Sequence, residues 1–258
     1  MRTESDQAIE FLGVSKRFQL HEGRTLREFL PALAKGRGWT APFYALRDVS
    51  FAVDRGETIA IIGRNGSGKS TLLKLIAGVM APTEGQVNVR GRVSPLIELG
   101  AGFHGDLTGR ENVFMNGAIL GMTQRQVRSR FDEIVAFAEL HDFIDTPVKR
   151  YSSGMYMRLG FAVAAHSDPD ILLVDEVLAV GDAAFQQKCF ERIREFQRNG
   201  TTVVLVTHGE GLVRMFCERV IVIDSGHVLA QGAPAEMIRL YQEQIAHVEA
   251  GSAAATRV

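Results

Sequence analysis

The apolar residues of this chain fall into short runs that alternate with stretches of helical periodicity. The runs cover residues 58–62, 171–174, 202–206 and 219–224. Runs of this kind, rich in Val, Ile and Leu, are typical of strands buried on both faces of a sheet. Helical spacing of apolar residues follows three of them, over residues 70–78, 185–198 and 210–217. This alternation predicts an α/β fold with a parallel sheet at its centre.

Further strands and turns are expected around this alternation. Strands are predicted at residues 8–14 and 49–53, and the sequence DRGE at residues 54–57 predicts a tight turn into the next strand. The sequence GQVNVRGRV at residues 85–93 predicts a β-hairpin, and DSGH at residues 224–227 predicts a second hairpin turn.

A helical segment interrupts the α/β pattern. Helices are expected at residues 112–120, 124–140 and 154–166, which all show a period of 3.6 residues. Thr123 is the candidate N-cap of the middle helix. Residues 234–248 predict a C-terminal helix, and the small and polar residues 249–258 predict a disordered tail.

Residues 20–42 form an insertion between the first two predicted strands. Its large apolar residues at helical spacing are Leu26, Phe29, Leu30 and Leu33. Charged residues lie between them, so a short amphipathic helix is expected. This helix either packs its apolar face on its own domain or presents a surface to a partner or substrate. The sequence leaves both alternatives open.

Composition narrows the class of protein. The chain has 258 residues, 46% of them hydrophobic, which is enough for a substantial core. Its 29 Lys and Arg residues balance 30 Asp and Glu residues, so no nucleic-acid partner is expected. A cytoplasmic location is expected, because no apolar run is long enough to span a bilayer and no signal peptide is present. Cys189 and Cys217 are expected to be reduced, structural thiols.

The sequence GRNGSGKS at residues 63–70 matches the phosphate-binding pattern G-x-x-x-x-G-K-[ST] at every fixed position. It follows a predicted strand and opens a predicted helix, which is the context that the pattern requires. The glycines let backbone N–H groups point at a polyphosphate, Lys69 would reach the β- and γ-phosphates, and the Ser70 hydroxyl would ligate Mg²⁺. The nucleotide-binding candidates here are Gly63, Arg64, Asn65, Gly66, Ser67, Gly68, Lys69, Ser70 and Thr71.

Two carboxylates follow the apolar run 171–174. Asp175 is placed to hold Mg²⁺ together with Ser70, and Glu176 is placed to accept a proton from an attacking water. A purely structural pair of acids at this point is harder to explain, because buried charge is costly without a compensating cation.

His208 comes shortly after another strand, residues 202–206, and in a parallel sheet it reaches the same edge as Asp175. It is a candidate for binding the γ-phosphate or orienting the water, although a lone histidine after a strand is commonly a polar loop residue. The sequence YSSGM at residues 151–155 opens a helix and makes either an anion site or an ordinary N-cap.

Taken in order, these motifs resemble those of ABC-transporter ATPase subunits. The segments that resemble the branch exporting polysaccharide (O-antigen, capsule or teichoic acid) are the SSGM form of residues 152–155, the run ELGAGF at residues 98–103, VGD at residues 180–182, and the insertion before Tyr44. The resemblance covers residues 8–244. It implies a P-loop nucleotide-binding domain with an N-terminal antiparallel β subdomain and an inserted helical subdomain.

The resemblance also implies site residues that spacing does not give. In the family two subunits face head to tail, so Ser152, Ser153 and Gly154 would act on the partner's ATP. Asp182 would lie in the loop that crosses the dimer interface, and His208 would contact the γ-phosphate.

An aromatic residue normally stacks on adenine in this family. Phe18 and Tyr44 both compete for that role, and the position of Phe18 after the first strand favours it slightly. The chain departs from the family where a glutamine usually senses Mg²⁺, since Glu98 is the nearest candidate there. It also has Ser153 and Met155 where glycine and glutamine are usual.

The expected domain comprises residues 1–248. Within it the resemblance assigns residues 8–98 and 171–232 to the core and β subdomain, 103–168 to the helical subdomain, 20–42 to the insertion and 233–248 to a C-terminal helix, with 249–258 as a tail. Relatives with an appended carbohydrate-binding domain have more residues after the core, so no such domain is expected here.

The expected function is that of a Mg²⁺-dependent ATPase that dimerises on ATP and drives export of a lipid-linked polysaccharide, with O-antigen favoured. The expected partners are a second copy of the chain and an integral membrane subunit, which holds the ATPase at the cytoplasmic face of the plasma (inner) membrane. Residues 106–112 lie where relatives meet that subunit. The alternatives are an ABC ATPase for another lipid or a drug, a soluble ABC ATPase, and a phosphoryl-transfer kinase.

Overall fold

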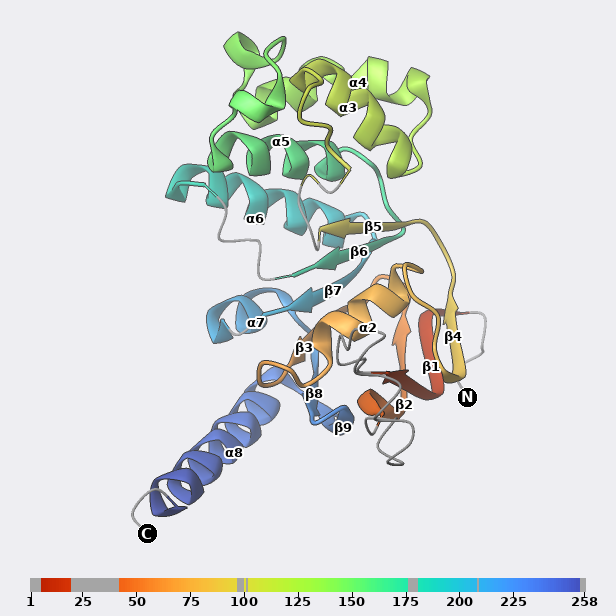
Figure 1. Ribbon diagram of the computed structural model, residues 1–258, viewed down its shortest axis with the longest axis vertical. Helices are drawn as coiled ribbons and strands as arrows, with labels where there is room; N and C mark the ends of the chain where they lie inside the picture. The colour runs from red at the N-terminus through yellow and green to blue at the C-terminus, as the bar shows by residue number, and fades with distance from the viewer. Residues whose placement is uncertain are drawn as a thin grey trace, which may run out of the picture.

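The computed structural model describes residues 6–19, 42–96, 100, 102–175, 181–207 and 209–255, with the backbone alone over the last ten (Figure 1). Strands form two sheets of three and six strands. The predicted amphipathic helix within residues 20–42 lies outside the described residues, except for Pro42. An α/β fold is therefore confirmed in the described part of the chain.

The larger sheet carries the strands that the apolar runs predicted. In spatial order it consists of β5 (Val93–Leu96), β6 (Ile171–Val174), β7 (Thr202–Val206), β3 (Thr58–Ile62), β8 (Arg219–Asp224) and β9 (His227–Gly232). The pairs from β5 to β8 are parallel and β9 is antiparallel to β8. The hairpin predicted at residues 224–227 is confirmed by the pairing of β8 with β9.

The central strands are buried on both faces, as continuous apolar runs predict. Alternate residues of β3 belong to different cores. Ile59 and Ile61 pack with the smaller, three-stranded sheet and with α2 (Lys69–Ile76), whereas Ala60 and Ile62 pack with helices on the opposite face. Those helices include α6 (Ala183–Arg198) and α7 (Glu210–Phe216). The sheet is thus a middle layer between two apolar cores.

The smaller sheet is antiparallel, with the order β2 (Phe43–Asp54), β1 (Gln7–Phe18) and β4 (Glu84–Val89). The hairpin predicted over residues 85–93 is wrong, because β4 pairs with β1 and β5 pairs with β6 in the other sheet. The chain changes sheets at Gly91, whose φ of 134° lies in the region that glycine tolerates.

The predicted helical segment is present at one end of the molecule, uppermost in Figure 1. It contains α3 (Gly109–Ile119), α4 (Gln124–Ala138), two short 3₁₀ helices (His141–Phe143 and Val148–Arg150) and α5 (Ser153–Ala165). A third apolar core holds these elements together. The predicted cap is confirmed, since the Thr123 hydroxyl accepts a hydrogen bond from the Gln126 N–H.

The last helix is longer than predicted. Helix α8 runs from Pro234 to Ala255 and extends away from the body of the molecule (Figure 1). The prediction of a disordered tail after residue 248 is therefore wrong as far as Ala255, because alanine-rich sequence continues the helix. Among the described residues, no helix combines the length and the apolar character needed to cross a membrane.

Candidate functional site

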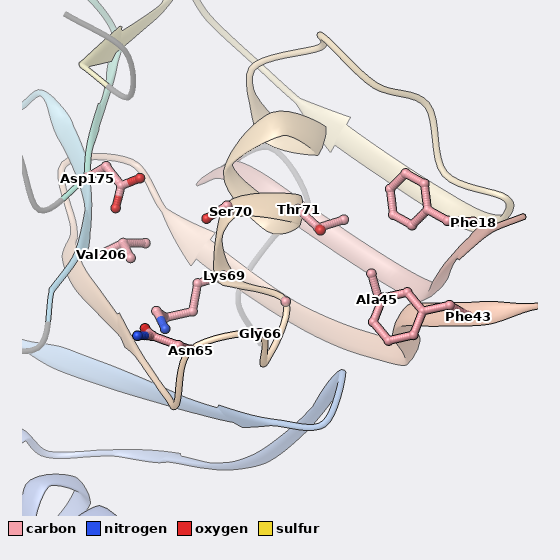
Figure 2. Close-up of a pocket in the computed structure, with 11 residues that line it drawn as sticks. Phe18, Phe43, Ala45, Asn65, Gly66, Lys69, Ser70, Thr71, Asp175 and Val206 are labelled. Atoms are coloured by element: carbon pink, nitrogen blue, oxygen red, sulfur yellow. The ribbon is translucent and has the colours of Figure 1, made fainter. Parts of the chain in front are cut away.

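A cavity of about 330 Å³ lies where the phosphate loop meets both sheets. The loop and the start of α2 supply the largest group of lining residues, namely Asn65, Gly66, Gly68, Lys69, Ser70 and Thr71. Figure 2 shows Phe18 and Phe43 at one end of this cavity and Asp175 at the other, with Lys69 and Ser70 between them. The structure therefore brings into one cavity part of the predicted phosphate loop, the predicted metal ligands Ser70 and Asp175, and Phe18, the favoured candidate for stacking on adenine.

The Lys69 ammonium lies inside the phosphate loop. Its Nζ donates hydrogen bonds to the carbonyl oxygens of Gly63, at 2.7 Å, and Arg64, at 2.9 Å. The residue is only 7% exposed although it carries a charge. A buried ammonium held by carbonyl groups at a cavity wall is available to an anionic ligand at the same wall.

Ser67 adds a second polar group to the loop interior. Its residue is 3% exposed, and its Oγ has no hydrogen-bond partner within the described part of the chain. A buried hydroxyl without a partner carries a desolvation cost of about 1–3 kcal/mol. The Ser67 hydroxyl can therefore donate a hydrogen bond to a ligand oxygen inside the loop.

The start of α2 faces the same cavity. Gly68 precedes its first residue with a φ of 111°, a conformation that a side chain would strain. Helix N-termini present unpaired N–H groups and a partial positive charge, so an anion bound at this end of α2 is stabilised.

Ser70 and Asp175 offer oxygen atoms to this cavity from different elements. Ser70 lies in the first turn of α2, and Asp175 directly follows β6. Hydroxyl and carboxylate oxygens are the hard ligands that Mg²⁺ prefers, so the two residues fit this metal. The predicted residues Glu98, Glu176 and His208 lie outside the described residues.

The aromatic end of the cavity differs from the sequence prediction in one residue. Phe18 lines the cavity, as does Phe43, which pairs with Phe18 across β1 and β2 and is 48% exposed. Tyr44 is not among the lining residues; Arg47 lies over its ring at 4.7 Å instead. Sequence reasoning missed Phe43, although alternation along a strand at Ala45 would have placed residues 43 and 45 on one face.

The segment YSSGM at residues 151–155, here called the signature segment, lies away from this cavity. Ser152 caps α5, because its Oγ accepts a hydrogen bond from the Met155 N–H at 3.2 Å. Ser152 and Ser153 are exposed, and the cavity lining includes neither of them nor Gly154. The signature segment is therefore not part of the cavity of its own chain.

Asp182 links the start of α6 to α5, the helix that the signature segment begins. It caps α6 by accepting a hydrogen bond from the Phe185 N–H at 2.9 Å, and it forms an ion pair with Arg158 of α5 at 2.7 Å. The Phe185 N–H and then Arg158 hold the pKa of Asp182 below its usual value. Arg158 also pairs with Glu139 at the end of α4, so one guanidinium ties α4 and α5 to the start of α6.

Residues 106–112 form a turn that leads into the start of α3. Thr108 and Glu111 make a capping box at the start of this helix. Asn112 is fully buried, and its amide bonds to the backbone of His104, Leu107 and Thr108. The turn therefore has a fixed shape at the surface of the helical segment.

The two cysteines, which were predicted to be reduced, structural thiols, are free, and both are buried. Burial raises the pKa of the Cys189 thiol, and likewise that of the Cys217 thiol, to about 12. Neither residue lines the cavity, so a structural role is consistent with their surroundings.

Comparisons with known proteins find similar chains. The family profile described as ABC transporter matches residues 46–179. The O-antigen export system ATP-binding protein RfbB of Myxococcus xanthus is 56% identical over 82% of this chain, which spans 48% of the length of that relative. A protein of the same name from Klebsiella pneumoniae is 46% identical over 92% of this chain and 98% of its own length.

A solved structure shows the same fold. It is the dimeric, post-hydrolysis state of the ATP-binding cassette MJ0796 bound to ADP and Pi, with a TM-score of 0.70 and 25% identity. The alignment covers 88% of this chain and 98% of the cassette.

Proposed function

Because this chain belongs to the ABC transporter family, we propose that it is the ATP-hydrolysing subunit of a system that exports a lipid-linked polysaccharide of the O-antigen class. The observation that carries this proposal is that Lys69, Ser70 and Asp175 line one and the same cavity. Those residue types at the edge of a parallel sheet serve nucleotide hydrolysis.

The phosphate loop binds the polyphosphate of ATP. The Lys69 ammonium donates hydrogen bonds to two loop carbonyl groups in this structure. When ATP binds, it also donates to the β- and γ-phosphates. The Ser67 hydroxyl, which has no partner within the described residues, donates to a phosphate oxygen. Gly63 and the N–H groups of the loop complete this cradle.

Ser70 and Asp175 would hold Mg²⁺, which neutralises charge on the transferred phosphoryl group when bound. Glu176 accepts the proton of the attacking water, and His208 contacts the γ-phosphate. Glu98 stands where the family has its metal-sensing glutamine and is assigned to the same metal environment.

The purine lies against the aromatic end of the cavity. Phe18 is assigned as the stacking residue, and Phe43 forms a second wall beside it. Tyr44 is the weaker candidate, since its ring lies under Arg47. Stacking on an aromatic ring is indifferent to the identity of the base, so this wall supplies affinity more than specificity.

A second copy of the chain completes the site. Ser152 and Ser153 are exposed and Gly154 is half-buried at the N-terminus of α5, where N–H groups and hydroxyls suit an anion. They reach the γ-phosphate of ATP bound by the partner copy, and Asp182 lies beside the same interface. Closure of the dimer therefore couples hydrolysis to movement of the two chains.

The export system supplies a membrane subunit through which the polysaccharide passes. The turn at residues 106–112, with its fixed shape, is assigned as part of the contact with that subunit. This contact places the chain at the cytoplasmic face of the inner membrane. An ABC ATPase for another lipid or a drug is the second candidate, and relatives named for O-antigen export argue against it.

A deletion strain tests the proposal. It is complemented with the natural chain, with Lys69→Ala, or with the control Lys74→Ala, which changes a lysine of the same helix outside the cavity. Surface O-antigen should return with the natural chain and the control, and lipid-linked polymer should accumulate inside cells that carry Lys69→Ala.

Three outcomes would contradict the proposal. Unchanged surface polysaccharide in the deletion strain excludes a role in its export. Normal export with Lys69→Ala excludes ATP as its energy source. Transfer of phosphate from ATP to an acceptor by the purified chain, without release of free phosphate, would identify a kinase instead.

A further inference from the structure

The turn between β8 and β9 supports the phosphate loop from outside the cavity. The Gly226 N–H donates a hydrogen bond to the carbonyl oxygen of Ser67 at 3.0 Å. Residues 224–227 are not among those that line the cavity. The turn therefore acts on the loop through the backbone and has no contact with the cavity itself.

The same glycine also holds strand β2. The Arg47 N–H donates to the carbonyl oxygen of Gly226 at 2.9 Å. Strand β2 is irregular at the next residue: Asp48 has a φ of 47°, and its N–H donates to the side-chain hydroxyl of Ser15 in β1. Two residues before Arg47, Ala45 forms part of the cavity wall.

The three segments approach so closely that side chains are excluded between them. A Cβ on Gly226 would lie 2.9 Å from the Ala45 carbonyl oxygen, and a Cβ on Gly68 would lie 2.6 Å from that same oxygen. A Cβ on Gly63 would lie 2.1 Å from the carbonyl oxygen of Ile223, at the end of β8. The β8–β9 turn, the phosphate loop and β2 are thus in backbone contact.

We propose that Gly226 is a positioning residue that sets the distance between the phosphate loop and the β2 wall. The loop holds the phosphates and β2 carries Phe43 and Ala45, so this distance decides whether one nucleotide can contact both. The inference rests on the proposed function. A side chain at position 226 weakens nucleotide binding by separating the two walls.

Gly200→Ala provides a matched control for Gly226→Ala. Both glycines have a positive φ, 82° at Gly226 and 78° at Gly200, so both substitutions impose the same backbone strain. A Cβ on Gly200 would meet nothing within 4 Å. A difference in ATP affinity between the two variants therefore reports the steric contact of the new Cβ with Ala45, and not the backbone strain that both variants share.

Titration calorimetry with ATP and with inorganic triphosphate separates the outcomes. Gly226→Ala should raise the dissociation constant for ATP roughly tenfold or more, since losing about 1.4 kcal/mol of contact with one wall lowers the affinity tenfold. Triphosphate, which needs the loop alone, should lose much less affinity, and Gly200→Ala should bind both ligands as the natural chain does. Equal affinities of the two variants for ATP would overturn the inference.

Hydrogen exchange on the natural chain gives a second test, which does not depend on whether Gly226→Ala folds. Saturating ATP should slow exchange at the amides of Gly226 and Arg47, and leave the amide of Gly200 unchanged. Unaltered exchange at Gly226 and Arg47 under bound ATP would overturn the inference. Failure of the natural chain to bind ATP would instead overturn the proposed function.

Discussion

The phosphate loop and the signature segment are both assigned to ATP, yet the fold holds them in different ways. The loop is packed into the protein: Lys69 is 7% exposed, and the loop backbone contacts β2 and the β8–β9 turn. The signature segment is a helix N-terminus at the surface, where the described hydrogen bond of Ser152 serves only to cap α5.

This difference indicates a division of labour. A preorganised loop binds a ligand without a further ordering cost, so one chain should hold ATP by itself. Exposed donors far from the cavity contribute nothing until another surface brings a phosphate to them. Binding is therefore expected to depend on the loop, and hydrolysis on the meeting of the loop with the signature segment of a second copy.

Loss of the loop ammonium should have the largest effect. Lys69→Ala should weaken ATP binding by the isolated chain about 10²-fold or more, because it removes the one buried charge that faces the phosphates among the residues lining the cavity. Titration calorimetry measures this change, with Lys74→Ala as the control. Retained affinity in Lys69→Ala would show that the loop does not bind the phosphates.

Loss of the Ser152 hydroxyl should spare binding and damage hydrolysis. Ser152→Ala is expected to lower the rate of phosphate release roughly 10-fold to 100-fold while the dissociation constant for ATP stays unchanged. Thr123→Ala is the matched control, since both residues cap a helix and both changes cost about 1 kcal/mol of stability. A similar loss of hydrolysis in both variants would reduce the role of Ser152 to that of a cap.

The aromatic end of the cavity gives a smaller effect on binding. Phe18→Ala and Phe43→Ala should each weaken ATP binding by about 1–3 kcal/mol, the range of a lost base stack, and leave triphosphate binding intact. Tyr44→Ala should change neither affinity, because Tyr44 does not line the cavity. A fluorescence titration measures these affinities. If Tyr44→Ala lowered the ATP affinity more than Phe18→Ala and Phe43→Ala did, Tyr44 would be the residue that stacks on adenine.

The buried thiols should show the smallest effect. With pKa values of about 12, Cys189 and Cys217 stay protonated at pH 8, so they should react with iodoacetamide far more slowly than a free cysteine. Mass spectrometry before and after addition of denaturant measures this. Rapid alkylation in the native state would show that the cores beside α6 and α7 open readily.

Much of the core could be predicted because its signals are local. Strand β3, the phosphate loop and the start of α2 follow from residues next to one another in the sequence. The Thr123 cap is equally local, since it depends on residues within one turn. Asp175 could be placed near Ser70 because parallel strands end at the same edge.

One error concerns contacts between distant segments. Residues 85–93 contain a turn sequence, but the choice between a hairpin and two separate sheets depends on β1 and β6, far away in the chain. Phe43 was missed because the predicted strand covered residues 49–53, whereas β2 begins at Phe43. The role of Gly226 could not be foreseen, because the sequence shows a turn and gives no indication of what packs against it.

The central claim is that each ATP site is shared by two copies of the chain, and mixed chains test it most directly. One chain carries Lys69→Ala and the other carries Ser152→Ala; each alone should hydrolyse little ATP. In a mixed dimer one site holds both changes and the other holds neither, so mixing should restore ATP hydrolysis well above either chain alone. If each site lies within one chain, no intact site exists in the mixture, and a rate that stays at the sum of the two inactive chains would contradict the account.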